Sequence, residues 1–203
     1  MARWWPGKGP TVAPWKVLRS SYSYADNFIR LRSDTVLLPN GTELSPYHVL
    51  EFDEWVCAIA LTADGRIVLV EEYRYGAGRA MLEFPSGGVA HRDEQPLAAM
   101  KRELEEETGY AGGTWHSLGA FFSNSANQSN RTHAFLALGV AKLCEPRPGP
   151  GEIIVTHETS WREFAAEAYA GNVELNSGHM SCLLLLQQYV ARSEDPAVRA
   201  LVG

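Results

Sequence analysis

A glutamate-rich segment between two glycines, residues 88–110, limits most strongly what this 203-residue chain can fold into. It reads GVAHRDEQPLAAMKRELEEETGY and places four glutamates within five positions, at residues 103 and 105–107. Pro96 fits the first turn of a helix, and Gly109 is typical of the position just past a helix C-terminus. We therefore expect a helix that begins near Asp93, as its N-cap, and ends at Gly109, after a strand break at residues 85–88.

Helical geometry decides which of these carboxylates share a face. At about 100° per residue, Glu106 lies about 60° to one side of Glu103, and Glu107 lies about 40° to the other. Three carboxylates thus share one face, whereas Glu105 points elsewhere, toward solvent. The apolar stripe expected to hold this helix against a sheet consists of Leu97, Met100 and Leu104.

Neighbouring carboxylates repel one another at neutral pH unless a cation lies between them. A hard divalent ion such as Mg²⁺ prefers oxygen ligands and retains several waters, so it can bridge protein carboxylates and a substrate phosphate. Arg102, four residues before Glu106, can hold one carboxylate in place. A run such as RELEEE is, by itself, more often a solvated helix face, so the surrounding spacing has to decide.

That spacing matches G-x(5)-E-x(7)-R-E-U-x-E-E-x-G-U, where U is bulky and apolar. Every specified position is filled, by Gly88, Glu94, Arg102, Glu103, Leu104, Glu106, Glu107, Gly109 and Tyr110. A chance match in a chain of this length is on the order of one in ten million at average residue frequencies. The pattern is the Nudix box. The chain resembles the Nudix hydrolases, which use bound Mg²⁺ or Mn²⁺ to cleave nucleoside diphosphates linked to another group.

The resemblance implies roles for the residues of the box. Glu103 and Glu107 match the family's usual metal ligands. Glu106 matches a further metal ligand or a hydrogen-bonding group of the family. Arg102 matches the residue that orients the carboxylates. The resemblance assigns both Glu106 and Arg102 to catalysis. Glu94 matches the first glutamate of the box, which usually supports the loop.

A main-chain carbonyl just before the box often completes the metal shell in this family. Members often read E-x-P-A-G, whose glycine opens the box, whereas this chain reads EFPSGG at residues 83–88. One residue is therefore inserted, and the carbonyl ligand belongs to Ser86 or Gly87, with Gly87 as the first candidate. Glu83 is a candidate substrate-binding residue.

The resemblance extends from about Trp15 to about residue 192. VEEYRY at residues 70–75 resembles the V-x-Q-Y-R-Y strand of the ADP-ribose pyrophosphatase branch, which makes Arg74 a candidate contact for phosphate or ribose. An arginine at a strand end equally suits pairing with a carboxylate. The general base of this branch often comes from a mobile loop late in the fold. Glu152, which follows the loop at residues 146–151, is the first candidate, and Glu145 and Glu158 are rivals.

The chain departs from this branch after the box. ADP-ribose pyrophosphatases usually carry a proline-containing turn there, whereas residues 123–130 read SNSANQSN. The amides and hydroxyls of this segment suit a sugar or phosphate, and they equally suit a polar surface turn. ADP-ribose and other nucleotide sugars are the first candidate substrates. Dinucleoside polyphosphates, coenzyme A and oxidised nucleotides are further candidates. A Nudix-like sensor that binds a nucleotide sugar without turnover is the alternative from another class.

The rest of the sequence predicts a mixed sheet between helices and a small N-terminal antiparallel sheet. Hairpins are expected at residues 34–44 and 55–72, where Asn40-Gly41 and Asp64-Gly65 supply the turns. Further strands are expected at residues 81–84, 115–122, 132–140 and 153–156, and helices at 161–170 and 181–192. By resemblance this is the α/β/α sandwich of the Nudix fold, an α+β arrangement. Residues 1–52 are its N-terminal β region, and residues 53–203 are the hydrolase domain.

A small sheet is only marginally stable alone, and in this branch it is usually exchanged across a homodimer. We therefore expect a homodimer that uses residues 15–52. Its aromatic residues are possible contacts for the partner's substrate base, although each suits ordinary packing better. They are Trp15, Tyr22, Tyr24 and Phe28.

Composition excludes several other classes of protein. The formal net charge of −6 argues against general binding to nucleic acid, and no run reaches the ~18 apolar residues of a membrane span. Three widely spaced cysteines, of which Cys57 and Cys182 lie in apolar runs as expected buried thiols, fit a reducing cytoplasm better than a disulfide framework. The spacing of His91, His133, His157 and His179 indicates no metal site.

Overall fold

The computed structural model describes residues 12–89 and 93–200. The chain divides into two compact units, Met1–Phe52 with Asn124–Ser129, and Asp53–Ser123 with Asn130–Gly203. The expected interpretation of His91 lies outside the described residues.

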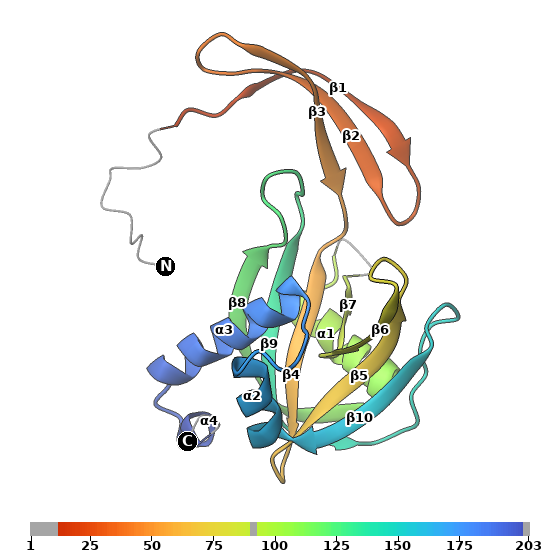
Figure 1. Ribbon diagram of the computed structural model, residues 1–203, viewed down its shortest axis with the longest axis vertical. Helices are drawn as coiled ribbons and strands as arrows, with labels where there is room; N and C mark the ends of the chain where they lie inside the picture. Colours follow the sequence, from red (N-terminus) through yellow and green to blue (C-terminus); the bar gives the residue numbers. More distant parts are fainter. Residues whose placement is uncertain (1–11, 90–92, 201–203) are drawn as a thin grey trace. The chain divides into compact units, whose positions relative to one another are not determined.

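The first unit contains the small antiparallel sheet that the sequence predicts. Its strands are β1 (Lys16–Ala25), β2 (Arg30–Leu37) and β3 (Glu43–Glu51), in the order β1-β2-β3 (Figure 1). The turn between β2 and β3 uses Gly41 at φ 85°, and Asn40 Oδ1 accepts the Thr42 N–H at 3.0 Å. The Asn-Gly hairpin is therefore confirmed, for the conformational reason that suggested it.

The amide-rich segment after the box belongs to this first unit. The Leu50 N–H donates to Asn127 O at 2.8 Å, and the Tyr47 hydroxyl donates to Ala126 O at 2.6 Å. Backbone carbonyls of the segment thus partner the end of β3. This contact gives residues 124–129 a structural role within the unit.

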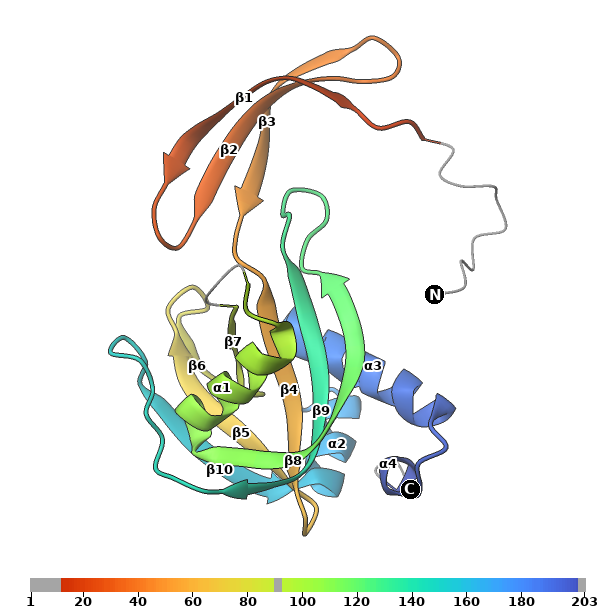
Figure 2. The same cartoon turned by 180° about the vertical axis from the view of Figure 1, so that it is seen from behind.

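The second unit is built on a seven-stranded mixed sheet (Figures 1 and 2). Its order is β10-β5-β4-β9-β8, where β6 pairs with β5, β7 pairs with β4, and only the named pair β4–β9 is parallel. The strands are β4 (Trp55–Thr62), β5 (Arg66–Arg74), β6 (Arg79–Glu83), β7 (Ser86–Gly88), β8 (Tyr110–Phe122), β9 (Arg131–Lys142) and β10 (Ile154–Ser160). The helices are α1 (Pro96–Thr108), α2 (Trp161–Tyr169), α3 (Ser177–Arg192) and α4 (Pro196–Arg199).

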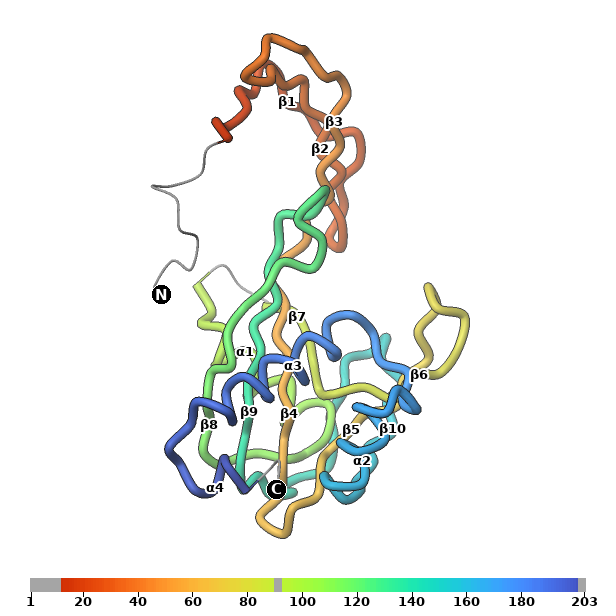
Figure 3. Tube along the Cα trace, turned by 60° about the vertical axis from the view of Figure 1, so that its left-hand side comes forward, coloured from red at the N-terminus to blue at the C-terminus, as the bar shows by residue number. Residues whose placement is uncertain are grey.

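Helices cover both faces of this sheet, which explains the continuous apolar sequence of β4. Val56, Ala58 and Ala60 belong to the core beneath α1, whereas Cys57 and Ile59 alternate with them and belong to the core beneath α2 and α3. Figures 1 and 2 show α1 on one face and α2 with α3 on the other. In Figure 3, α3 runs across β8, β9 and β4. The predicted sandwich and the buried thiols of Cys57 and Cys182 are confirmed.

The expected start of α1 is wrong. Its N-cap is Gln95, without a side-chain capping hydrogen bond, because Pro96 at the first helical position fixes the start of the helix. Its end is confirmed, since Gly109 adopts φ 76° and its N–H bonds to Glu105 O. The apolar stripe is partly wrong. Leu97 is 37% exposed, and Ala99 takes its place beside Met100 and Leu104.

Several other boundaries differ from the expected ones. The break at residues 85–88 contains a strand, because Ser86–Gly88 pairs with β4. Strand β8 begins directly after the helix, at Tyr110, and β10 continues to Ser160. Helix α3 begins at Ser177, four residues earlier than expected, because Asn176 Oδ1 accepts the His179 N–H at 2.9 Å as an N-cap.

None of the helices in the described parts of the chain has the length and apolarity needed to cross a bilayer.

Candidate active site

The site is built where α1 approaches strand β7. A Cβ atom on Gly87 would lie 2.2 Å from Cδ of Glu103, so only glycine allows this contact between backbone and carboxylate. On the next turn of the helix, Glu107 Oε2 accepts the Ser86 N–H at 3.1 Å. Glu103 and Glu107 therefore flank one short stretch of backbone, Ser86–Gly87.

Glu107 is the most perturbed carboxyl group of the helix. It is only 5% exposed, and burial raises its pKa to about 9, against the opposing effect of the Ser86 N–H. The negative charges of Glu103 and Glu152 raise it further. Glu107 is therefore a buried group and not an accessible one on the surface of the helix. The helical wheel identifies its face, but the closeness of β7 determines its burial.

The pKa of Glu103, one helical turn before Glu107, is also raised. Burial raises the pKa of Glu103, and the neighbouring Arg102 guanidinium lowers it in part. The charges of Glu106 and Glu152 add to the increase. The pKa values of both carboxyl groups are thus raised mainly by burial, and the neighbouring arginines offset this only in part.

Arg102 binds most of the remaining carboxylates of the box. It donates from Nε to Glu94 Oε1 at 3.1 Å, and from Nη1 to Glu103 Oε1 at 2.8 Å and Glu106 Oε2 at 3.0 Å. Its Nη2 donates to Gly88 O at 3.1 Å. These partners, the hydrogen bond to Glu94 first, raise the pKa of Arg102. One guanidinium therefore ties the first glutamate of the box to the helix and to the end of β7.

Glu105 and Glu106 are both about half exposed, but they have different partners. Glu106 is 45% exposed at its side chain, and Glu105 lies outside the carboxylate group, paired with Arg147 at 3.2 Å. A hollow of about 420 Å³ is lined by Arg102, Glu105, Glu106 and Arg147. The structure thus brings three of the four glutamates to Arg102 or to Ser86–Gly87, and directs Glu105 away.

Arg74 and Glu83 form an ion pair on neighbouring strands. Arg74 Nη2 donates to Glu83 Oε2 at 2.6 Å, and Nη1 lies 2.9 Å from Glu72 Oε2. Glu83 is 1% exposed and lies within 3.4 Å of Asn176 Nδ2. Burial raises the pKa of Glu72. Pairing with carboxylates, one of the two roles considered for Arg74, is thus present in the structure.

Among the three candidate bases, Glu152 is the one whose negative charge acts on the buried carboxyl groups of the site. Its charge contributes to the raised pKa values of Glu72, Glu103 and Glu107. Its Oε2 accepts the Gly149 N–H at 2.7 Å. Of the two rivals, Glu145 lies 3.6 Å from Lys142, and Glu158 bonds to Arg66 Nε at 3.1 Å.

Of the histidines considered from the sequence, the three that are described either bond to carboxylates outside the box or are buried. His133 bonds to Glu54 and His157 to Glu71. His179 lies in the core, where burial lowers its pKa to about 4, and its ring packs 5.2 Å from that of Phe84. Sequence reasoning missed Asn176, which contacts Glu83. An asparagine before Ser-Gly is an N-cap pattern that indicates its position.

The donor chemistry of the site fits a hard divalent cation. Over residues 12–89 and 93–200, no three His, Cys, Asp or Glu side chains form a ready-made metal cluster, since Glu103 and Glu106 are turned toward Arg102. Glu103 and Glu107 nevertheless present oxygen donors whose pKa values are raised. A cation between them would offset the cost of burying these charges, which is the main cause of the raised pKa values, and would also relieve the repulsion between them.

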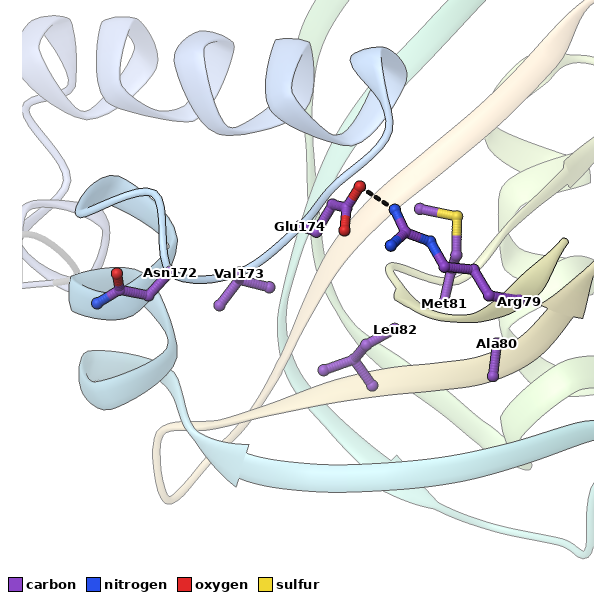
Figure 4. Close-up of a pocket in the computed structure, with 7 residues that line it drawn as sticks. All are labelled: Arg79, Ala80, Met81, Leu82, Asn172, Val173 and Glu174. Atoms are coloured by element: carbon purple, nitrogen blue, oxygen red, sulfur yellow. Dashed lines mark hydrogen bonds and ion pairs between the residues drawn. The ribbon is translucent and has the colours of Figure 1, made fainter. Parts of the chain in front are cut away.

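A second hollow, of about 280 Å³, lies between β6 and the connection from α2 to α3 (Figure 4). Leu82 and Met81 line it from β6, and Val173 from the connection. An ion pair between Arg79 and Glu174 crosses its edge. No residue of α1 lines this hollow, so the carboxylate group does not open into it.

Comparisons with known proteins agree on the kind of domain present. Residues 52–188 match the family model of the NUDIX domain, and residues 15–50 match that of the nucleoside diphosphate sugar hydrolase N-terminal domain. The chain is 31% identical over 127 residues to the methanol dehydrogenase activator of Bacillus methanolicus, covering 63% of this chain and 68% of that protein. It is 30% identical over 132 residues to the ADP-ribose pyrophosphatase of Bacillus subtilis (strain 168), covering 65% and 70%.

One solved structure, described as an ADP compounds hydrolase, has a similar fold. The TM-score is 0.75 at 17% identity, and the match covers 90% of this chain and 97% of that one.

Proposed function

The chain belongs to the Nudix family of hydrolases, and from this premise we propose that it cleaves the pyrophosphate linkage of a nucleoside diphosphate joined to a sugar. ADP-ribose is the first substrate to test, because a relative that is 30% identical is named an ADP-ribose pyrophosphatase. The match of residues 15–50 to a nucleoside diphosphate sugar hydrolase domain supports the wider class of nucleotide sugars. The expected products are a nucleoside monophosphate and a sugar phosphate.

The observation that carries this proposal is the pair of raised-pKa carboxyl groups at Ser86–Gly87. Glu103, Glu106, Glu107 and the main-chain carbonyl of Gly87 would hold Mg²⁺, or Mn²⁺ in its place. When bound, the metal would neutralise phosphate oxygens and polarise the attacking water. Arg102 would keep Glu103 and Glu106 oriented through the hydrogen bonds that it already donates to them.

Arg74 and Glu83 are proposed to bind the substrate. The ion pairs of Arg74 use Nε and one N–H on each terminal nitrogen, so each terminal nitrogen retains a second N–H for a phosphate or ribose oxygen. Glu83, buried beneath the guanidinium, would fix its direction.

Glu152 is proposed as the general base. One of its oxygens accepts the Gly149 N–H, which leaves the other oxygen able to accept a proton. In the reaction, a water oxygen bonds to phosphorus, the bond from phosphorus to the bridging oxygen breaks, and the water proton passes to Glu152. The leaving phosphate keeps the former bridging oxygen.

We infer that the protein works as a homodimer in a reducing cytoplasm. Strand β1 lies at the edge of its sheet, and all ten of its residues are exposed, among them Val17, Leu18, Tyr22 and Tyr24. An exposed apolar edge strand is a ready surface for pairing with a second chain. The three free cysteines support the reducing compartment.

A substrate panel tests the proposed function. Purified protein is incubated with ADP-ribose, other nucleotide sugars, dinucleoside polyphosphates and coenzyme A, each with Mg²⁺, Mn²⁺ or EDTA, and released mononucleotide is measured. We expect metal-dependent release from a nucleotide sugar. Binding of a nucleotide sugar without release under any condition would instead identify a sensor.

A further inference from the structure

The connection between β9 and β10, residues 143–153, carries Glu152, and its first half is fastened to the end of α1 (Figure 2). The N–H groups of Leu143 and Cys144 donate to Gly109 O at 2.8 and 3.2 Å. The Arg147 N–H donates to Glu106 O at 2.7 Å. Carbonyls at a helix C-terminus have no partner within the helix, so the connection satisfies groups that would otherwise need water.

The contact between these two segments is one of backbone against backbone. A Cβ atom on Gly109 would lie 2.1 Å from Cys144 O, and the residue has φ 76°. Glycine is therefore required at this point both for its conformation and for the approach of the connection. The first half of the connection is fixed to the helix that carries the candidate metal ligands.

Arg147 is the last residue of the connection that holds the helix, and it does so twice. Its main chain bonds to Glu106 O, and its side-chain Nη2 donates to Glu105 Oε1 at 3.2 Å. The side chain is 71% exposed and stands at the rim of the hollow that Arg102 and Glu106 also line. Arg147 is thus held to two neighbouring residues of α1. The ion pair with Glu105 restricts how far the chain can rotate about the hydrogen bond to Glu106 O.

Beyond Arg147 the chain turns on itself. The Gly149 N–H donates to Glu152 Oε2 at 2.7 Å, and the Glu152 N–H donates to Gly149 O at 3.0 Å. Among the described residues, the hydrogen bonds of these two residues are only to each other. The turn is therefore held from two sides, at Arg147 on α1 and at Ile154, where β10 begins opposite Glu72 of β5. Arg147 fixes it on the side of α1, before the chain contacts this helix again through Thr156 Oγ1, 3.4 Å from Glu107 O.

The geometry points to Arg147 as a positioning residue for Glu152, because its ion pair with Glu105 restricts, on the side of α1, the turn that carries Glu152. This inference rests on the proposed role of Glu152 as the base. Loss of the ion pair leaves the main-chain bond in place but lets the turn at residues 149–152 rotate. Glu152 then spends less time in reach of the attacking water, whereas substrate contacts on β5 and β6 are unaffected.

The test compares Arg147→Ala, Glu105→Ala and the charge reversal Glu105→Arg/Arg147→Glu. Steady-state kcat and KM are measured with the best substrate of the panel and Mg²⁺, and amide hydrogen exchange is followed at residues 148–153. Each single variant is expected to lower kcat about two- to fivefold, the size that an exposed ion pair allows, with KM unchanged and faster exchange. The charge reversal restores both values.

Lys142→Ala is the matched control, because it removes another exposed ion pair, with Glu145, from the start of the same connection. It should leave kcat and the exchange at residues 148–153 unchanged. A raised KM with normal kcat in Arg147→Ala would make Arg147 a substrate contact and overturn the inference. Unchanged kcat and exchange, or failure of the charge reversal to restore them, would also overturn it.

Glu152→Gln separates this inference from the proposed function. Normal turnover in that variant removes Glu152 from the reaction and overturns the positioning role, while the hydrolase activity stands. Absence of turnover in the unaltered protein contradicts the proposed function and the positioning role together. The hydrogen-exchange data then show only whether the Arg147–Glu105 ion pair restrains residues 148–153. A strong loss of kcat in Glu152→Gln with no effect of Arg147→Ala overturns the positioning role alone.

Discussion

Replacement of Glu107 by glutamine should stabilise the metal-free protein while it strongly lowers turnover. The pKa of this carboxyl group is about 9 in the folded protein and 4.5 in the reference state. Because the pKa is raised on folding, the folded protein favours the protonated form of Glu107. Its contribution to the free energy of unfolding is therefore fully present below pH 4.5 and is lost as the pH rises toward 9. At pH 7 the loss is about 3 kcal/mol, from about 2.5 pH units at 1.36 kcal/mol each.

Glu107→Gln removes the titrating group but keeps an oxygen that can accept the Ser86 N–H. We expect its thermal midpoint in EDTA at pH 7 to be about 6–12 °C above that of the unaltered protein, since about 1 kcal/mol corresponds to about 2–4 °C at this size. The difference should shrink toward pH 5. Turnover should fall at least about 100-fold, and Mg²⁺ should raise the midpoint of the unaltered protein more than that of the variant.

Differential scanning fluorimetry from pH 5 to 9, with EDTA or Mg²⁺, measures these effects. Glu105→Gln is the control, because it removes the same charge from the same helix at an exposed ion pair and should change stability by less than about 1 kcal/mol. If the midpoints of Glu107→Gln and the unaltered protein run parallel across this pH range, burial of an ionisable Glu107 is not what limits stability.

The other predictions concern the backbone at β7, the arginine on β5 and the assembly. Gly87→Ala should lower turnover at least about tenfold with a midpoint within a few degrees, because the added Cβ displaces the flexible end of Glu103; an unchanged metal titration would argue against this contact. Arg74→Lys should raise KM for a nucleotide sugar more than it lowers kcat, since lysine cannot reproduce the fork that faces Glu83 and Glu72; an unchanged KM would leave Arg74 a purely structural residue. Light scattering at micromolar concentration should give the mass of two chains, and a fully active monomer would contradict the dimer.

Sequence patterns predicted correctly the turns and helix ends that depend only on the residues at that point of the chain. The Asn40-Gly41 turn and the end of α1 at Gly109 follow from residues that tolerate positive φ, and both occur where expected. The start of α1 was missed because two local signals compete there. Asp93 is the better capping residue, but Pro96 fixes the first helical position, and the proline decides.

Features that depend on a neighbouring element were not predictable from the same patterns. Residues 86–88 read as a break, and they form a strand only because β4 offers a partner. The helical wheel places Glu107 near Glu103, but it contains no information on how closely the sheet approaches. Gly87 was a clue, since a glycine before an acidic helix permits close contact of backbone and side chain, but its partner could be identified only in three dimensions.

The distribution of partners explains why so much negative charge is gathered on one helix. Arg102 bonds to Glu94, Glu103 and Glu106, whereas Glu107 accepts its hydrogen bond from the neutral Ser86 N–H. Glu107 is also the group whose pKa burial raises to about 9, so the need for a neutralising positive charge is greatest at the Glu107 end of the carboxylate face. A cation bound there gains both the attraction of the carboxylates and the relief of their repulsion. The instability that we predict for the metal-free protein and the metal affinity that we propose therefore have the same origin, the burial of Glu107 beside Glu103.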